Sequence, residues 1–212
     1  MSGGRLQEEL SLGGDLGRPW PFGALRAGHY RCIIADPPWS FHNWSAAGEK
    51  KNANQHYACM SLVDIRALPV SELARPDGCG LLMWATSPLL DEAVDTLKAW
   101  GFDFKGCGSW GKLSSTGKAR AFGPGYIFRV SCEFYLVGMR GKLKRQSASV
   151  RNFIEAPVRE HSRKPDQIFE DAKKLWPGPY LELFSRQSRP GWDAWGLETG
   201  KFNPTETEEG EI

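Results

Sequence analysis

Long apolar stretches are missing from this sequence. The longest apolar runs are short, such as Gly80 to Ala85, whereas a helix that spans a bilayer needs about 20 consecutive apolar residues. The first residues, Met1 to Leu16, are polar and rich in glycine and lack the basic start and apolar block of a secretory signal. We therefore expect no membrane contact and a cytoplasmic location.

Metal-binding patterns are missing too. No Cys-x-x-Cys pair occurs, and the histidines do not group with cysteines at the spacing of a zinc site. The cysteines are odd in number and lie far apart, which is typical of free thiols in a reducing compartment. We expect no bound metal, and free thiols at Cys32, Cys59, Cys79, Cys107 and Cys132.

A large excess of one charge is also absent, since the formal net charge of the 212 residues is +2. The residues from Glu198 onward hold five acids and one lysine, a charge of −4, which leaves +6 on residues 1–197. A mildly basic body permits nucleic-acid binding. We predict a weakly ordered arm at 1–16, one domain at 17–200 and a flexible acidic tail at 201–212.

Short apolar runs alternate with helical patterns along the domain. Helices are predicted from Ser61, from Ser87 (the N-cap, followed by Pro88) to Gly101, and from Pro165 to Leu175. Such alternation predicts an α/β fold, a mostly parallel sheet with helices on both faces. The predicted strands are Tyr30–Ala35, Leu81–Trp84, Phe104–Trp110, Glu133–Val137, Phe153–Ala156 and Tyr180–Phe184.

Polar residues follow several of these strands. Ligands of parallel sheets bind beyond the carboxyl ends of the strands, so residues just after strands should meet at one rim. We expect Asp36, Thr86 with Ser87, Lys112 and Arg186 to lie there.

The tetrapeptide Asp36, Pro37, Pro38 and Trp39 directly follows the first strand. It suits the activation of an amino group such as N6 of adenine, whose lone pair is delocalised into the ring. The carboxylate of Asp36 and the carbonyl of Pro37 would accept its two N–H bonds, and the two prolines would fix both acceptors in advance. Trp39 offers a face on which an extruded base can stack. The structural alternative is a strand that ends in a Pro-Pro turn beside a core tryptophan.

With this motif the sequence resembles the S-adenosylmethionine-dependent adenine-N6 methyltransferases related to the catalytic subunit of the eukaryotic mRNA adenosine methyltransferase, most closely their compact bacterial and phage branch. The resemblance runs from about Arg31 to Trp195. It implies a Rossmann-like methyltransferase fold with a permuted motif order, in which the catalytic motif precedes the cofactor strand. The landmarks are "IIADPPW" (33–39), "HYACMS" (56–61), "LLMWAT" (81–86), "WGK" (110–112), "REHSRKPD" (159–166), "LELFSR" (181–186) and "RPGWDAWG" (189–196).

The resemblance also implies roles for individual residues. Asp36 would contact both the target amine and the methionine end of S-adenosylmethionine, and Lys112 would lie near the cofactor carboxylate and the incoming base. Glu182 and Arg186 would pair at the cofactor end of the sheet. Further cofactor contacts are expected from Ser188 and Glu198, and further substrate contacts from Tyr57, Trp44 and Trp39. The product would be S-adenosylhomocysteine.

Two parts of the sequence depart from the family pattern. A third matches the family, but we do not expect it to take part in catalysis. Leu197 stands where relatives usually carry an asparagine that contacts the cofactor ribose. The stretch Arg18 to Ala24 has no match for an upstream aspartate of eukaryotic members. For His161, Lys164 and Asp166 we expect structural or nucleic-acid contacts, not catalysis.

Nucleic acid, with DNA favoured over RNA, is the expected partner, and a homodimer or paralogue partner is possible. Arg140 to Arg151 holds five basic residues and no acid; we expect a basic loop beside the rim that binds phosphates. Phe41, Trp44 and Tyr126 could stack on bases. Two other functions stay open. A glutamine methyltransferase would carry Asn and Tyr at the ends of the tetrapeptide, and a silent nucleic-acid or paralogue-binding scaffold would tend to lose it.

Overall fold

Strand β1 (Cys32–Ala35) lies inside a seven-stranded sheet of order β5-β3-β4-β2-β1-β6-β7 in the computed structural model, which describes residues 19–39, 60–160 and 163–203. All six predicted strands are present, with ends that differ by a few residues, and β7 was not predicted. The other strands are β2 (Gly78–Ala85), β3 (Asp103–Leu113), β4 (Cys132–Gly141), β5 (Phe153–Pro157), β6 (Tyr180–Leu183) and β7 (Trp192–Trp195).

The direction of the strands defines one rim. Strand β1 pairs in parallel with β2 and β6, β6 with β7, and β3 with β5, whereas β4 is antiparallel to both β2 and β3. The mostly parallel sheet is therefore confirmed. The carboxyl ends of six strands and the amino end of β4 share a rim, which brings Asp36, Thr86, Lys112 and Glu133 to the same edge.

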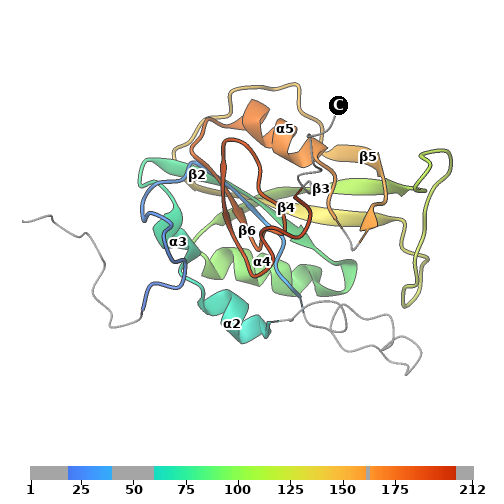
Figure 1. Ribbon diagram of the computed structural model, residues 1–212, viewed down its shortest axis with the longest axis horizontal. Coiled ribbons are helices and arrows are strands. Elements are labelled where there is room, and N and C mark those ends of the chain that lie inside the picture. Colours follow the sequence, from blue (N-terminus) through green and yellow to red (C-terminus); the bar gives the residue numbers. More distant parts are fainter. Residues whose placement is uncertain (1–18, 40–59, 161–162, 204–212) are drawn as a thin grey trace, which may run out of the picture.

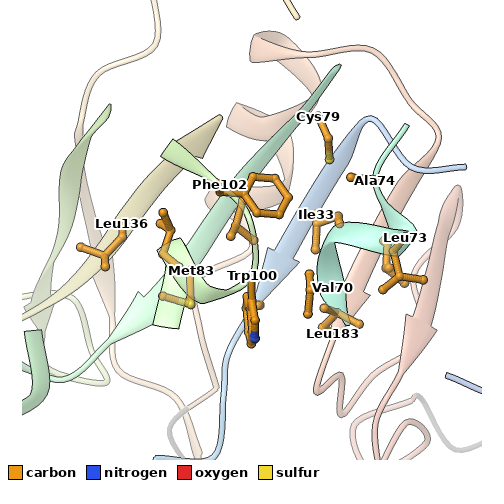
Figure 2. Packing of buried hydrophobic residues seen from close by; sticks show 14 of the residues in the cluster. Ile33, Val70, Leu73, Ala74, Cys79, Met83, Trp100, Phe102, Leu136 and Leu183 are labelled. Atoms are coloured by element: carbon orange, nitrogen blue, oxygen red, sulfur yellow. The ribbon is translucent and has the colours of Figure 1, made fainter. Parts of the chain in front are cut away.

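Two hydrophobic layers cover the sheet, as Figure 1 shows, with α5 (Gln167–Leu175) on one face and α2 (Leu62–Ala67), α3 (Val70–Leu73) and α4 (Leu90–Ala99) on the other. Successive β1 side chains point to opposite faces, so Ile33 joins the layer under α2 to α4 while Ile34 joins the layer under α5. Figure 2 shows the first layer, in which Ile33, Met83 and Trp100 pack together.

The helix starts agree with the sequence in one case and differ in another. Ser61 caps α2, because its hydroxyl accepts the Asp64 N–H at 3.1 Å. Ser87 is not an N-cap: it begins a short 3₁₀ turn (Ser87–Leu89) that leads into α4. Pro88 has no N–H to give and sits in that first turn, so the tighter turn loses no backbone bond there. Gly101, with φ of 78°, ends the helix as predicted.

The basic loop Arg140 to Arg151 does not begin beside the rim that carries Asp36. Gly141, at the end of β4, pairs with Gly78, the first residue of β2. Because β4 is antiparallel to β2, the loop starts at the opposite end of the sheet, so the expected placement is wrong. The sequence indicated the strand but not its direction.

None of the helices in the described ranges combines the length and apolar composition needed to cross a membrane. Those ranges also contain no cluster of His, Cys, Asp and Glu side chains suited to a metal ion. Four of the cysteines fall in the described residues, and all four are free thiols: Cys32, Cys79, Cys107 and Cys132.

Candidate active site

The tetrapeptide leaves the carboxyl end of β1 as a rigid turn. The Asp36 N–H donates to the carbonyl of Leu183 on β6 at 3.4 Å, and the Trp39 N–H donates to the carbonyl of Pro37 at 2.8 Å. Two prolines fix φ through the turn. The carbonyl oxygen of Pro37 keeps its second lone pair for another donor, so the two predicted acceptors are both held by the backbone.

Trp39 is part of the core in the described residues. Its ring is 5% exposed, and its indole N–H donates to the carbonyl of Trp84 on β2 at 3.0 Å. The ring therefore ties the turn to the neighbouring strand. Base stacking on Trp39 stays a prediction, and it requires the base to reach a ring that is now almost covered.

Lys164 is the main cation at Asp36. Its Nζ lies 3.0 Å from Oδ2 of Asp36 and 3.0 Å from Oε1 of Glu133, and its side chain is 11% exposed. The same Nζ lies 5.6 Å from the centre of the Trp84 ring. The structure thus places Lys164 against the residue predicted to be catalytic, which our expectation of a merely structural or nucleic-acid role did not foresee.

Glu133 continues this cluster toward β3. Its other carboxylate oxygen lies 2.9 Å from Nζ of Lys112, so Asp36, Lys164, Glu133 and Lys112 alternate in charge along the rim. Lys112 also lies 5.0 Å from the centre of the Trp110 ring. The structure therefore connects Lys112 to Asp36 through Glu133 and Lys164.

The alternation shifts the pKa of Glu133 and of Lys164 toward their charged forms. Burial alone would raise the pKa of Glu133, but Lys164 and Lys112 hold that pKa below its usual value. Burial alone would likewise lower the pKa of Lys164, whereas Asp36 and Glu133 raise it. The site therefore holds the ammonium of Lys164 between the carboxyl groups of Asp36 and Glu133.

Glu182 has the opposite electrostatics. Burial raises its pKa to about 7, against the lowering effects of Arg189 and Ser185, and Asp36 raises it further. Nε of Arg189 lies 3.4 Å from Oε2 of Glu182, a long contact, and the expected pairing of Glu182 with Arg186 stays a prediction. Oγ of Ser185 lies 3.0 Å from Glu182 and 2.7 Å from the carbonyl oxygen of Gln187. The Ser185 hydroxyl has one hydrogen and can donate to only one of these two oxygens. If it donates to the Gln187 carbonyl, a protonated Glu182 can donate the other hydrogen bond to Oγ of Ser185.

A narrow pocket connects Asp36 with the end of β6. Its lining includes Asp36, Lys164, Glu182, Arg186 and Phe202, and its free volume is about 30 Å³. That volume corresponds to about one water molecule, so any nucleoside must displace side chains. Phe202 lines the pocket at the end of β6. Its ring lies 5.3 Å from the guanidinium of Arg186.

The chemistry of this pocket fits the zwitterionic cofactor that the resemblance implies. An amino acid end needs one anion and one cation side by side, and Asp36 with Lys164 provides them. Thr86 Oγ1 and Glu198 Oε2 are buried and have no hydrogen-bond partner in the described residues. A buried polar atom without a partner is costly, so each atom is suited to a polar group of a ligand, although neither residue is among those that line this pocket.

The predicted ribose-side residues lie in the turn after β7 and the segment after β6. Ser188 is exposed and exchanges hydrogen bonds with Asn203. Glu198 pairs with Lys201 at 2.7 Å, and Leu197 is 90% exposed. Lys201 and Asn203, which belong to the predicted acidic tail, thus contact Glu198 and Ser188. The cofactor roles of Ser188 and Glu198 stay predictions.

Asp166 acts as an ion-pair centre and not as a helix cap. Its carboxylate accepts from Arg159 and from Arg189, both at 2.6 Å, and it makes no side-chain hydrogen bond to the start of α5. It therefore fixes Arg189 beside Glu182. His161, Tyr57 and Trp44, which we also named, lie outside the described residues.

Sequence reasoning missed Lys164 and Glu133 as members of the site. For Lys164 the available signal was the "REHSRKPD" landmark, whose lysine had no obvious structural purpose beside a helix start. For Glu133 the signal was weaker, because an acidic first residue of a strand reaches this rim only if that strand is antiparallel.

Comparison with known proteins agrees with the geometry. The profile of the MT-A70 family matches residues 30–198. The type II methyltransferase M.MunI of a Mycoplasma species is 30% identical over 188 residues, which cover 80% of this chain and 77% of that protein.

Two eukaryotic relatives are much longer than this chain. The MT-A70-like N(6)-adenosine-methyltransferase of Drosophila melanogaster is 31% identical over 170 residues, 78% of this chain but 26% of that protein. The human N(6)-adenine-specific methyltransferase METTL4 is 26% identical over 192 residues, 80% of this chain and 37% of that protein.

Proposed function

Because the chain belongs to the MT-A70 family, we propose that it transfers the methyl group of S-adenosylmethionine to the N6 amino group of adenine in DNA. One observation carries the proposal. Asp36 ends the central strand β1 in a double-proline turn, with the ammonium of Lys164 3.0 Å from its carboxylate. A site for this reaction needs rigid hydrogen-bond acceptors beside the cofactor's amino acid end.

The chain's own groups would orient the amine. Asp36 accepts one N–H of the adenine amino group and the Pro37 carbonyl accepts the other, which turns the nitrogen lone pair toward the methyl donor. Positive charge develops on that nitrogen during transfer, and both acceptors favour it. Lys164 lies beside Asp36 and fixes the position of its carboxyl group.

The cofactor supplies an electrophilic methyl group bonded to a sulfonium. Lys164 and Asp36 would hold its carboxylate and ammonium groups, and Glu198 and Thr86, whose buried oxygens lack partners, would accept or donate hydrogen bonds to its polar atoms. Lys112 would position Glu133 and thereby Lys164. Ser188 and Arg186 line the way to the ribose end. No metal is part of this proposal.

We favour DNA because the sequence resembles the compact bacterial and phage branch of the family, and the type II methyltransferase M.MunI of a Mycoplasma species is 30% identical to it. We expect the enzyme to work in the cytoplasm, alone, as a homodimer or with a paralogue. RNA methylation is the second candidate, since relatives of that kind match as well.

The test offers radiolabelled S-adenosylmethionine with duplex DNA, single-stranded DNA and RNA, to the wild type and to Asp36→Ala. We expect label in DNA from the wild type and a loss of about 100- to 1000-fold in the variant, the size expected when a group that acts in the transition state is removed. Retained transfer by Asp36→Ala contradicts the mechanism. No transfer to any nucleic acid, together with no cofactor binding at micromolar concentration, favours the silent scaffold.

A further inference from the structure

The connection between β3 and β4 leaves the sheet on the same rim as Asp36. Strand β3 ends at Leu113 and β4 begins at Cys132, and residues 114–131 extend beyond the sheet at the right of Figure 1. Lys112 and Glu133, the neighbours of Lys164, flank this connection. The connection is therefore attached directly to the proposed active site.

A short backbone ladder supports the outer half of the connection. Gly123 and Val130 exchange two hydrogen bonds, of 2.8 and 3.1 Å. The six residues between them, Pro124 to Arg129, form a tip, and Gly125 permits their close approach because a Cβ there would lie 2.2 Å from the Phe128 carbonyl oxygen. We call residues 124–129 the hairpin tip.

Apolar side chains on and beside the hairpin tip are unusually exposed. Ile127 is 87% exposed, Phe128 81%, Phe122 64% and Tyr126 58%. The other large apolar side chains that are exposed in the described residues are scattered singly over the chain. Isolated exposed apolar residues are ordinary, but a contiguous group marks a surface that binds something.

The charge of the connection identifies the partner as polyanionic. Residues 114–131 contain Lys118, Arg120 and Arg129 and no acidic residue. The guanidinium of Arg129 lies 5.0 Å from the centre of the Phe122 ring, so a cation and an aromatic face are presented together. Cations for phosphates interleaved with aromatic and apolar groups for bases are typical of nucleic-acid binding.

We propose that the hairpin tip is a wedge that enters the base stack of duplex DNA beside the target adenine, with Ile127 and Phe128 in the stack and Arg129 and Lys118 at the phosphates, while Arg120 pairs with Glu155 at 3.0 Å. The inference rests on the proposed function and adds a substrate form to it: duplex, not single strand. A base inside a duplex cannot reach Asp36 until it is extruded. Apolar side chains that fill the vacated space lower the cost of extrusion.

The test compares Ile127→Ser/Phe128→Ser with the wild type on genomic DNA free of N6-methyladenine, used native and after heat denaturation. Both side chains are exposed, so the variant should fold. We expect kcat/KM on native DNA to fall by about tenfold or more, and on denatured DNA by less than about threefold, because only the duplex must be opened. Val63→Ser, at a residue that is 76% exposed on α2, should change neither value.

Filter binding of the same two DNAs gives a readout that needs no methyl transfer. The variant should bind native DNA about tenfold more weakly and denatured DNA almost unchanged. If the variant binds native DNA more weakly than the wild type does, but the wild type methylates neither DNA, the proposed function fails and the wedge stands. An equal loss on both DNAs, no loss, or a wild type that methylates only denatured DNA overturns the wedge. The wedge is also overturned if the substitutions leave DNA binding unchanged and only alter the mass of the protein in solution, measured by light scattering. The tip would then be a protein interface.

Discussion

Nζ of Lys164 lies 3.0 Å from Oδ2 of Asp36, and no third side chain intervenes between the ammonium and the carboxylate. The two residues come from distant parts of the chain, and the cation reaches equally toward Glu133. Lys164 therefore separates two carboxyl groups that would otherwise face each other in a nearly buried site.

Lys164→Met should lose both stability and activity. It removes the cation beside Asp36 and leaves Glu133 with Lys112 as its remaining counter-ion, and breaking a buried ion pair in this way costs about 3 kcal/mol. Urea unfolding measures that loss. Adding Glu133→Gln removes the charge of Glu133, so the double variant should regain stability while methyl transfer stays at least about 100-fold below wild type. Regained activity would mean that Lys164 serves only the fold.

Lys105→Met is the matched control. Its ammonium lies 3.4 Å from Asp103 on an exposed part of β3, with 52% of the side chain exposed. Exposed ion pairs contribute less than about 1 kcal/mol, so this variant should unfold and react like the wild type.

Glu182→Gln should change how stability depends on pH. Burial raises the pKa of Glu182 from 4.5 to about 7, so the folded chain holds this proton after the unfolded chain has released it. The stabilisation is fully present below pH 4.5 and is lost as the pH rises through about 7, a change on the order of 2 kcal/mol.

The measurement is the free energy of unfolding of both proteins at pH values from about 4 to about 8. This range covers both pKa values of Glu182, in the unfolded and in the folded chain. The difference between wild type and Glu182→Gln should fall steadily with rising pH. Glu170→Gln, an exposed change on α5, controls for the loss of one carboxylate from the chain. A difference that is flat over the range contradicts a proton on Glu182.

Trp39→Phe and Trp39→Leu separate the structural part of Trp39 from base stacking. Both remove the indole donor and leave the Trp84 carbonyl without its 3.0 Å hydrogen bond, which costs about 1–2 kcal/mol each. Only phenylalanine keeps an aromatic face. If the base stacks there, Trp39→Leu should lose about tenfold more activity than Trp39→Phe. Equal activities would assign Trp39 to the core alone.

Leu197→Asn should tighten cofactor binding. Leu197 is 90% exposed beside Glu198, whose Oε2 is buried and has no hydrogen-bond partner in the described residues. An amide there adds a donor and an acceptor for the ribose hydroxyls, and one hydrogen bond is worth about 1 kcal/mol, or about fivefold in Kd. Calorimetry with S-adenosylmethionine measures it, with Leu197→Ala as the control that adds no amide. No change or a loss would show that Leu197 does not face the ribose.

The sequence was sufficient for those parts of the fold that follow from local patterns. Ile33 and Ile34 stand in a continuous apolar run, which predicted a buried strand, and the prolines after it predicted where that strand ends. Gly101 marked the end of α4. Strand β7, Trp192–Trp195, was not predicted, because its four residues are too few to show a clear apolar alternation.

The rest depends on contacts between distant residues. Glu133 joins the site only because β4 runs against its neighbours, and strand direction is not encoded in any local window. Lys164 reaches Asp36 across the end of the sheet, where a "KPD" sequence looks like a helix start. Asp166 holds Arg189 beside Glu182, a contact between distant residues that the sequence did not indicate.

Mass spectrometry of nucleosides from treated DNA tests the central claim most directly. Native DNA free of N6-methyladenine is incubated with S-adenosylmethionine and either the wild type or Asp36→Ala, then digested completely. We predict N6-methyldeoxyadenosine from the wild type, no other methylated nucleoside, and none from Asp36→Ala. Methylated cytosine, or N6-methyldeoxyadenosine from both proteins in equal amounts, would contradict the assignment of Asp36 to the adenine amino group.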